Sequence, residues 1–443
     1  MRHLDGGPVD SPKEVDGSLP TAVTLTVTSG GSPQSGIKVY FQGSDSSLIS
    51  NTMTDSNGVA SAIMPNGGFV TAIDPTSALG GGAFHAIYTF AGVKSGDQLL
   101  IKDDFSSSVD VTVTAPVDAT AGVTSYLFST PCDNTTVVAP GSAAQPQATL
   151  SLDGPCATMS DFLIASLDDG GQVLNWFYAP NKAVAAAVDL TASTYAAATP
   201  KSYTFTNASA FGSFNIDQLF VSSKGRVVTL SGGAFGKGSP YTGSINATPF
   251  TAALDVVDAS ASAGATEHHL LDWGPFSSTY TTDVGARLLP EFDLPAVDTT
   301  AHTVGWTESA PGVTPDFALT VLSAQRTGLG FIWNIAAPYS GATIAMPTLP
   351  TDVADFTITA ADSTEFFGVA LGKVPGGYDA VRANIFSVSG PEAFAVGASG
   401  SMTIEVWNMP RLARELPRLS RLDVPGFVSG IIQDRSRHSH WRK

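Results

Sequence analysis

The sequence predicts an all-β protein made of tandem antiparallel β-sandwich domains. Three observations support this fold class. Apolar and polar residues alternate with a period of two, and clusters of Gly, Pro, Asn and Asp recur between the alternating segments. Charged residues make up only 14% of the 443 positions, about half the share of an ordinary soluble domain. Because 43% of the residues are hydrophobic, the chain can bury a sizeable core, which excludes wholesale disorder.

Residues 1–20 show no strand pattern. They are rich in Gly, Pro and Asp and have almost nothing to bury, so we expect a disordered tether. The chain does not open with the apolar segment of a signal peptide, and a lipid anchor would have to lie upstream of Met1. A sequence lacking its signal, a start codon assigned too late and a cytosolic protein are all compatible with this start. No apolar run reaches about 18 residues, so no transmembrane segment is expected.

Residues 21–115 show the alternation most clearly. Apolar side chains occupy one face and polar side chains the other in segments 23–28, 37–42 and 109–114. In the turn cluster Asp55-Ser-Asn57-Gly58, the Asp and Asn side chains can cap the turn while the glycine supplies a positive φ. We therefore expect one immunoglobulin-like β-sandwich in this part of the chain.

Two runs in this part carry a resemblance to a known kind of module. They are Val27-Thr-Ser-Gly-Gly-Ser-Pro-Gln-Ser-Gly-Ile-Lys-Val-Tyr-Phe41 and Thr54-Asp-Ser-Asn-Gly-Val-Ala-Ser-Ala62. This pattern resembles bacterial immunoglobulin-like and carboxypeptidase-regulatory-like modules, in which a T-D-x-N-G-x-A run makes the turn into a strand. The resemblance implies a spacer, a stalk or an adhesive domain, and it implies no particular activity.

Residues 116–210 predict a second β domain. Cys132 and Cys156 follow prolines in loop-like sequence, where core packing is poor, so we expect a disulfide that closes a loop of about 25 residues. Such a bond indicates an oxidising compartment, and two buried free thiols are the alternative. The Ala-rich stretch 182–198 contains helix formers, but its Val, Thr and Pro content favours strand and loop.

Residues 211–408 predict a larger β-sandwich domain whose last clean alternation is Met402, Ile404 and Val406. The runs Trp333-Asn-Ile-Ala-Ala-Pro and Met346-Pro-Thr-Leu-Pro join the tether, the first module and the cysteine segment in a second resemblance. Taken together, the whole chain resembles large secreted lipoproteins of myxobacterial type. This resemblance brings no catalytic residues with it.

The densest group of candidate metal ligands is His268 and His269, flanked by Glu267 and Asp272. The two zinc-binding histidines of a metalloprotease helix are four residues apart, whereas adjacent residues on a strand point to opposite faces. We therefore expect ordinary loop or surface histidines and no metal. A site completed by the remote His302 or His85 is the weaker alternative.

Other chemistry has little support in the sequence. There is no Gly-x-Ser-x-Gly pentapeptide, and the glycine-rich run 233–239 lacks the spacing of a phosphate-binding loop. Asp168 and Asp169 precede two glycines and predict a turn, with calcium binding as the alternative. Paired carboxylates of a glycosidase have no local signature and stay open. For the tryptophans in or beside strands we expect core positions rather than a sugar-binding platform: Trp176, Trp273, Trp306, Trp333 and Trp407.

Charge divides the chain into two unlike parts. Residues 411–443 carry eight cations and three anions, a net charge of +5, whereas the preceding part carries a net charge of −22. We expect a disordered basic tail at 409–443, and docking on an anionic membrane or on the acidic body is the alternative. The acidic body excludes nucleic acid as its partner, because phosphate binding needs a basic surface.

These observations favour a non-enzymatic protein of the cell envelope or the extracellular space. We expect it to be secreted or surface-anchored and to serve adhesion, scaffolding or binding of a surface ligand, either a glycan or a protein. No cofactor is expected. The alternatives are a secreted carbohydrate-active hydrolase with dispersed carboxylates and a binding module that depends on calcium or another metal.

Overall fold

The computed structural model describes most of the chain between residues 21 and 407. The predicted tether and the predicted basic tail lie outside the described residues, as do residues 236–239 of the glycine-rich run. Strands dominate, so the predicted all-β fold class is confirmed. Within the described part, helix is limited to α1 (Tyr378–Val381), η1 (Gly154–Ala157), η2 (Thr351–Phe356) and η3 (Arg382–Asn384). The described ranges are 21–29, 31–74, 84–103, 108–141, 144–209, 211, 214–222, 227–235, 240–249, 253–263, 266–386, 395 and 397–407.

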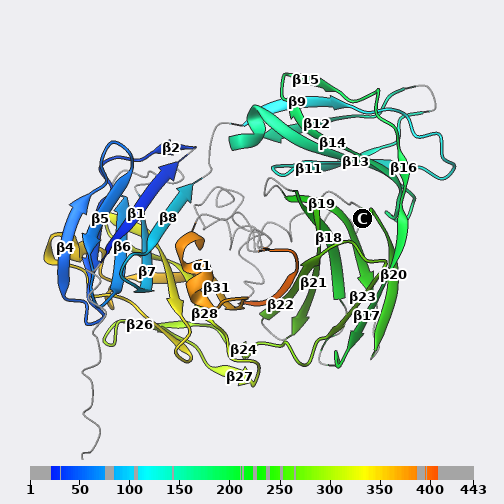
Figure 1. Cartoon of the computed structure of the whole chain (residues 1–443). Coiled ribbons are helices and arrows are strands. Elements are labelled where there is room, and N and C mark those ends of the chain that lie inside the picture. The colour runs from blue at the N-terminus through cyan, green and yellow to red at the C-terminus, as the bar shows by residue number, and fades with distance from the viewer. Residues whose placement is uncertain are drawn as a thin grey trace, which may run out of the picture.

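One large sheet joins distant parts of the sequence (Figure 1). Strands β7 and β29 pair in parallel, and this pairing connects the N-terminal module to the C-terminal half of the chain. Four of the described strand pairings are parallel, and the others are antiparallel. The sheet has twelve strands, in the order β19 (Val227–Phe235), β18 (Phe214–Ser222), β21 (Ala253–Ala263), β22 (Thr266–Gly274), β32 (Gly400–Trp407), β31 (Ser363–Lys373), β28 (Phe317–Arg326), β29 (Leu329–Pro338), β7 (Phe84–Val93), β6 (Gly68–Asp74), β3 (Lys38–Gln42) and β4 (Leu48–Met53).

A smaller sheet packs on the β3–β6–β7 end of the large sheet and completes the first sandwich. Its β1 alternates buried and half-buried positions as the sequence predicts, and Val23 and Leu25 share a core with Val39 and Phe41. The large sheet therefore buries the apolar face of this module. The small sheet contains β1 (Ala22–Ser29), β2 (Ser32–Pro33), β5 (Val59–Ile63) and β8 (Gln98–Asp103).

The second sandwich, drawn in cyan to green in Figure 1, holds the two cysteines. Its three-stranded sheet contains β9 (Val109–Thr114), β12 (Gln147–Leu152) and β15 (Ala187–Asp189). Backbone pairing thus crosses the boundary predicted after residue 115, because β9 lies before that boundary but pairs with β12 and β15 of the second sandwich. The facing sheet contains β11 (Asn134–Val138), β10 (Ser125–Ser129), β13 (Met159–Leu167), β14 (Val173–Ala183) and β16 (Ala196–Ala197).

The rest of the large sheet is covered by segments from several parts of the chain. One cover is the three-stranded sheet of β20 (Tyr241–Ala247), β17 (Thr199–Thr206) and β23 (Thr279–Asp283), whose core includes Tyr203 beside Leu270 of β22. Strand β17 lies before the boundary predicted at residue 210, yet it packs on strands that follow it. The other cover contains β24 (Glu291–Phe292), β25 (Ala296–Asp298), β26 (Thr303–Gly305), β27 (Glu308–Ala310), β30 (Thr343–Ala345) and η2.

Covering on both faces explains the pattern of the central strands. Eight consecutive residues of β28 are buried, so this strand shows no alternation between core and solvent. Strands covered on both faces read as continuous buried runs, because neither face meets water. Any polar side chain placed on such a strand is also removed from water and needs a partner inside the protein.

Candidate functional site

The chemistry-bearing side chains lie where β18, β21, β22 and β32 run side by side in the large sheet and where β17 of the covering sheet packs on them. They are buried because sheets and loops cover both faces of these strands. Burying an unpaired charge is very costly, so side chains of this kind are expected to occur in pairs. The buried polar and charged residues of this cluster, each less than a tenth exposed, are Lys201, Gln218, Asp255, Asp258, Glu267, His268, His269 and Glu405.

His268 and His269 occupy consecutive positions of β22 and serve opposite faces of the sheet. His268 forms a pair with Glu405, which is directly opposite on β32, and its ring packs edge-on against Phe211. His269 Nδ1 lies 3.1 Å from Asp258 Oδ2 on the other side of the sheet. Each histidine therefore has its own carboxylate partner.

These positions differ from the loop or surface positions expected for the two histidines. His268 is 2% exposed and His269 is 4% exposed. Burial of β22 depends on segments far away in the sequence that cover both its faces. The residue pattern of β22 itself does not predict these segments. Burial also raises the pKa of Glu405 above its ordinary value, and the hydrogen bond and charge of His268 oppose this rise.

The other candidate metal ligands are spread over the molecule. Among the described residues, no three His, Cys, Asp or Glu side chains come together as metal ligands would. The His85 ring packs against Phe356, with 5.0 Å between ring centroids, and His302 sits in a turn with a φ of 53°. Asp272 binds Arg287, with 2.5 Å between Oδ2 and Nη1. The structure thus does not bring His85 or His302 to the histidine pair.

The two aspartate turns have well-defined roles in the backbone. Asp168 Oδ1 accepts the backbone N–H groups of Gly170 and Gln172 at 2.9 and 2.8 Å and closes the turn between β13 and β14, while Asp169 is exposed. Asp55 Oδ1 likewise accepts the N–H groups of Asn57 and Val59, and these bonds lower the pKa of Asp55.

Gly58 completes the Asp55 turn. Its φ is +73°, and a Cβ atom at this position would lie 2.4 Å from the carbonyl oxygen of Val27. Both the backbone angle and the close approach of β1 therefore require glycine.

The predicted disulfide between Cys132 and Cys156 is present. It joins the loop after β10 to η1, and Cys156 is buried in the core of the second sandwich. Three of the tryptophans expected in the core are buried in two other cores, Trp273 in one and Trp306 and Trp333 in the other, whereas Trp176 and Trp407 are half-buried.

Lys201 is a functional candidate that local sequence reasoning missed. It is 2% exposed and pairs with Asp255, and its Nζ lies 5.3 Å from the centroid of the Phe276 ring. The same carboxylate accepts a hydrogen bond from Gln218. One signal was available: Lys201 shares the buried parity of β17 with Tyr203, so a charge occupies an apolar position of the alternation.

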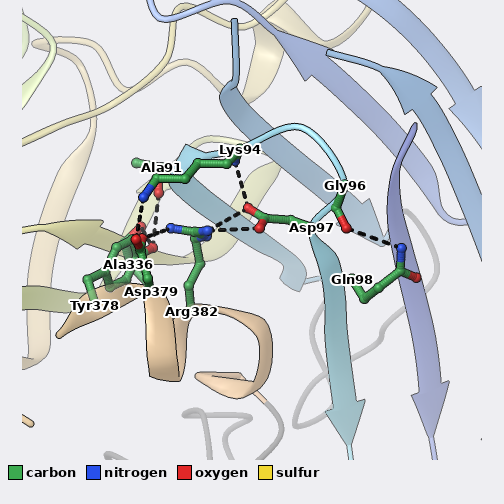
Figure 2. A network of polar contacts seen from close by, with 9 residues as sticks. All are labelled: Ala91, Lys94, Gly96, Asp97, Gln98, Ala336, Tyr378, Asp379 and Arg382. Atoms are coloured by element: carbon green, nitrogen blue, oxygen red, sulfur yellow. Dashed lines mark hydrogen bonds and ion pairs between the residues drawn. The ribbon is translucent and has the colours of Figure 1, made fainter. Parts of the chain in front are cut away.

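A second network that the sequence did not reveal fastens α1 and η3, which begins at Arg382, to the turn between β7 and β8 (Figure 2). Arg382 Nη2 donates to Asp97 Oδ1 at 2.8 Å, and Nη1 donates to Asp379 Oδ1 at 2.6 Å. The guanidinium carbon lies 5.4 Å from the ring centroid of Tyr378. Burial disfavours the charged guanidinium, but its bonds to the two carboxylates outweigh this effect and raise the pKa of Arg382.

Comparisons with known proteins do not assign a family. No family model and no curated protein matches the chain. Among solved structures, the Bacillus anthracis TIE protein aligns over 60% of this chain and 50% of its own length, with 10% identity and a TM-score of 0.15. A streptococcal ancillary pilin aligns over 60% of this chain and 98% of its own, with 9% identity and a TM-score of 0.14. The pilus adhesin SpaC from Lactobacillus rhamnosus GG aligns over 72% and 43%, with 10% identity and a TM-score of 0.12.

These are weak likenesses to β-rich surface proteins of bacteria. At such TM-scores these likenesses carry no argument about the function of this chain. No helix in the described part of the chain is long and apolar enough to span a membrane.

Proposed function

We propose that this chain is a non-enzymatic protein of the cell envelope or the extracellular space, secreted or surface-anchored, that serves adhesion, scaffolding or ligand binding. The observation that carries the proposal is the Cys132–Cys156 disulfide. Disulfides form and persist in oxidising compartments, and they are rare in cytosolic proteins, where thiols are kept reduced.

The use of the buried charges supports a structural role. Lys201 pairs with Asp255, His268 with Glu405, and His269 with Asp258, all inside the sandwich layers. Catalytic groups need access to a substrate, whereas these groups contact each other across strands of one fold. We infer that these buried pairs help to specify how the layers pack.

Among the described residues, β4 ends the large sheet without a further partner strand, and this edge supports a binding role. Strand β4 exposes Leu48, Ile49 and Met53, and Ile63 of the neighbouring β5 is 56% exposed. Proline and charged side chains usually block contact with an edge strand. The six residues of β4 contain neither. An apolar edge that is open to solvent is suited to contact with a surface ligand.

The compartment is tested by thiol labelling in cells that produce the protein. We expect Cys132 and Cys156 to react with an alkylating reagent only after reduction. Labelling of both thiols without reductant would contradict a location outside the cytosol.

The binding role is tested with purified protein on glycan and protein arrays, together with an assay for released reducing sugar. We expect binding without turnover. We also expect Ile49→Lys to weaken binding and Leu294→Lys, at an exposed apolar position elsewhere, to leave it unchanged. Sugar release that disappears in Asp258→Asn or Glu267→Gln would make the protein a hydrolase and refute the proposal.

A further inference from the structure

We propose that Lys201 and Gln218 are joined by an intramolecular isopeptide bond, formed with release of ammonia and assisted by Asp255. This inference goes beyond the proposed surface role and does not depend on any ligand. It starts from three buried side chains on three strands. Lys201 on β17 is 2% exposed, Gln218 on β18 is 0% exposed and Asp255 on β21 is 5% exposed.

Asp255 holds the two reacting groups together. Its Oδ2 contacts Lys201 Nζ, and its Oδ1 accepts a hydrogen bond from Gln218 Nε2. The amine and the carboxamide thus lie against the two oxygens of one carboxylate. Holding two reactants in place converts an encounter in solution into an intramolecular step, which gives a large gain in rate.

The surroundings exclude water from the reacting groups. The rings of Tyr203 and Phe276 flank the amine, with centroids 5.7 and 5.3 Å from Lys201 Nζ. Tyr203 belongs to the apolar core between β17 and the large sheet. Exclusion of water protects the carboxamide from hydrolysis and strengthens the polar contacts inside the site.

A backbone donor is in place for the charge that the reaction develops. Gln218 Oε1 accepts a hydrogen bond from the backbone N–H of Thr248 at 3.3 Å, and Thr248 is fully buried. When the amine attacks Cδ of Gln218, negative charge grows on this oxygen. A fixed backbone N–H stabilises such an oxyanion without rearrangement.

The step balances without an oxidant or a co-reactant. Asp255 takes one proton from the Lys201 ammonium, and the free amine attacks Cδ of Gln218. The bond between Cδ and Nε2 breaks as Asp255 returns the proton to Nε2. The leaving ammonia removes the surplus proton of the new amide as ammonium, and Asp255 ends as the carboxylate with which it began.

The new bond ties the two layers of this sandwich together. Lys201 lies on β17 of the three-stranded sheet, and Gln218 lies on β18 of the large sheet. The separation of these sheets would then require breaking a covalent bond, in addition to exposing the apolar core between them.

The test is the intact mass of the purified full chain after reduction of its disulfide, followed by peptide mapping. We expect a mass lower than the sequence mass by one ammonia, and a branched peptide that joins the segments around Lys201 and Gln218. Lys201→Arg keeps a cation beside Asp255 but cannot form the bond, so it should show its full mass. Asp255→Asn should also show its full mass, because it lacks the proton carrier.

Lys373→Arg, at a half-exposed lysine paired with Asp316, is the matched control and should keep the mass deficit. Full mass of the folded unmodified sequence would overturn the proposal. It would equally be overturned by loss of one water, which would make Asp255 the acyl partner, or by loss of ammonia mapped to another residue.

Discussion

Arg382→Met tests whether the network in Figure 2 fastens α1 to the first sandwich. Methionine keeps much of the length of the side chain and removes the guanidinium. The Arg382 side chain is 5% exposed and its partner Asp97 is 19% exposed, so the substitution leaves a mostly buried carboxylate without its cation. Removal of one partner from a buried pair costs roughly 3–5 kcal/mol.

Two features of the structure reduce this figure. Asp97 keeps a hydrogen bond from the Lys94 backbone N–H at 2.6 Å, and part of its side chain still meets water. We therefore expect a loss of about 2–3 kcal/mol in local stability, after allowance for the remaining hydrogen bond. That loss corresponds to a decrease of about 30- to 150-fold in protection from hydrogen exchange.

The measurement is native-state hydrogen exchange, because a chain with several sandwiches need not unfold in one step. The faster exchange should appear in α1 and in the turn between β7 and β8, since the network joins these two segments. Asp379→Asn is the matched control within the network. This substitution removes the charge that contacts Lys94, whose side chain is 62% exposed. It also removes the charge that contacts Arg382, but the Asp379 side chain itself is 55% exposed.

We expect this exposed substitution to cost at most about 1 kcal/mol. Equal effects of Arg382→Met and Asp379→Asn would refute the reasoning from burial. So would faster exchange confined to α1, because it would show that the turn between β7 and β8 does not depend on the network.

Three further predictions concern the disulfide, a turn glycine and a buried carboxylate. Replacement of both cysteines by serine opens a loop with a sequence separation of 24 and should cost the second sandwich about 3 kcal/mol, seen by calorimetry as a lower Tm; an unchanged Tm would contradict it. In Gly58→Ala the new Cβ atom meets the carbonyl oxygen of Val27 on β1, whereas Gly31, with a similar φ of +77°, has nothing within 4 Å of that position. Gly58→Ala should therefore lower the free energy of unfolding, measured by denaturant titration, by at least about 1 kcal/mol more than Gly31→Ala does. Because burial raises the pKa of Glu405, the folded state holds its proton more tightly than the unfolded state does. The stability that this carboxyl contributes is fully present below its ordinary value of 4.5 and falls as pH rises through the raised pKa; Glu405→Gln should abolish that fall in Tm, and an unchanged pH profile would refute the assignment.

Some features of the site were predictable because they depend on neighbours in sequence. The Asp55 turn follows from an acceptor side chain, the next few backbone N–H groups and one glycine. The disulfide followed from two cysteines in loop-like sequence. The opposite orientation of His268 and His269 followed from the period of a strand, which alternates between faces whatever the strand packs against.

The burial of the same histidines was not predictable, because the layers that cover β22 come from other parts of the chain. The Arg382 network shows the same limit, since Arg382 and Asp97 are 285 positions apart in sequence. Lys201 combines a feature that the sequence predicts with one that only the packing shows. Its parity with Tyr203 was visible in the sequence, but its partner Asp255 became known only from the packing of β17 on β21.

The sequence by itself determined the all-β class, the positions of many strands, the turn chemistry and the disulfide, because each of these rests on local periodicity or local geometry. The tertiary structure alone decided that β7 and β29 pair in parallel and make one twelve-stranded sheet from the two ends of the chain. It also decided that β9 and β17 pack across the predicted boundaries. The physical reason is that an alternating strand specifies which of its faces is apolar but does not specify its partner, which depends on long-range backbone pairing and on how the layers fill a common core.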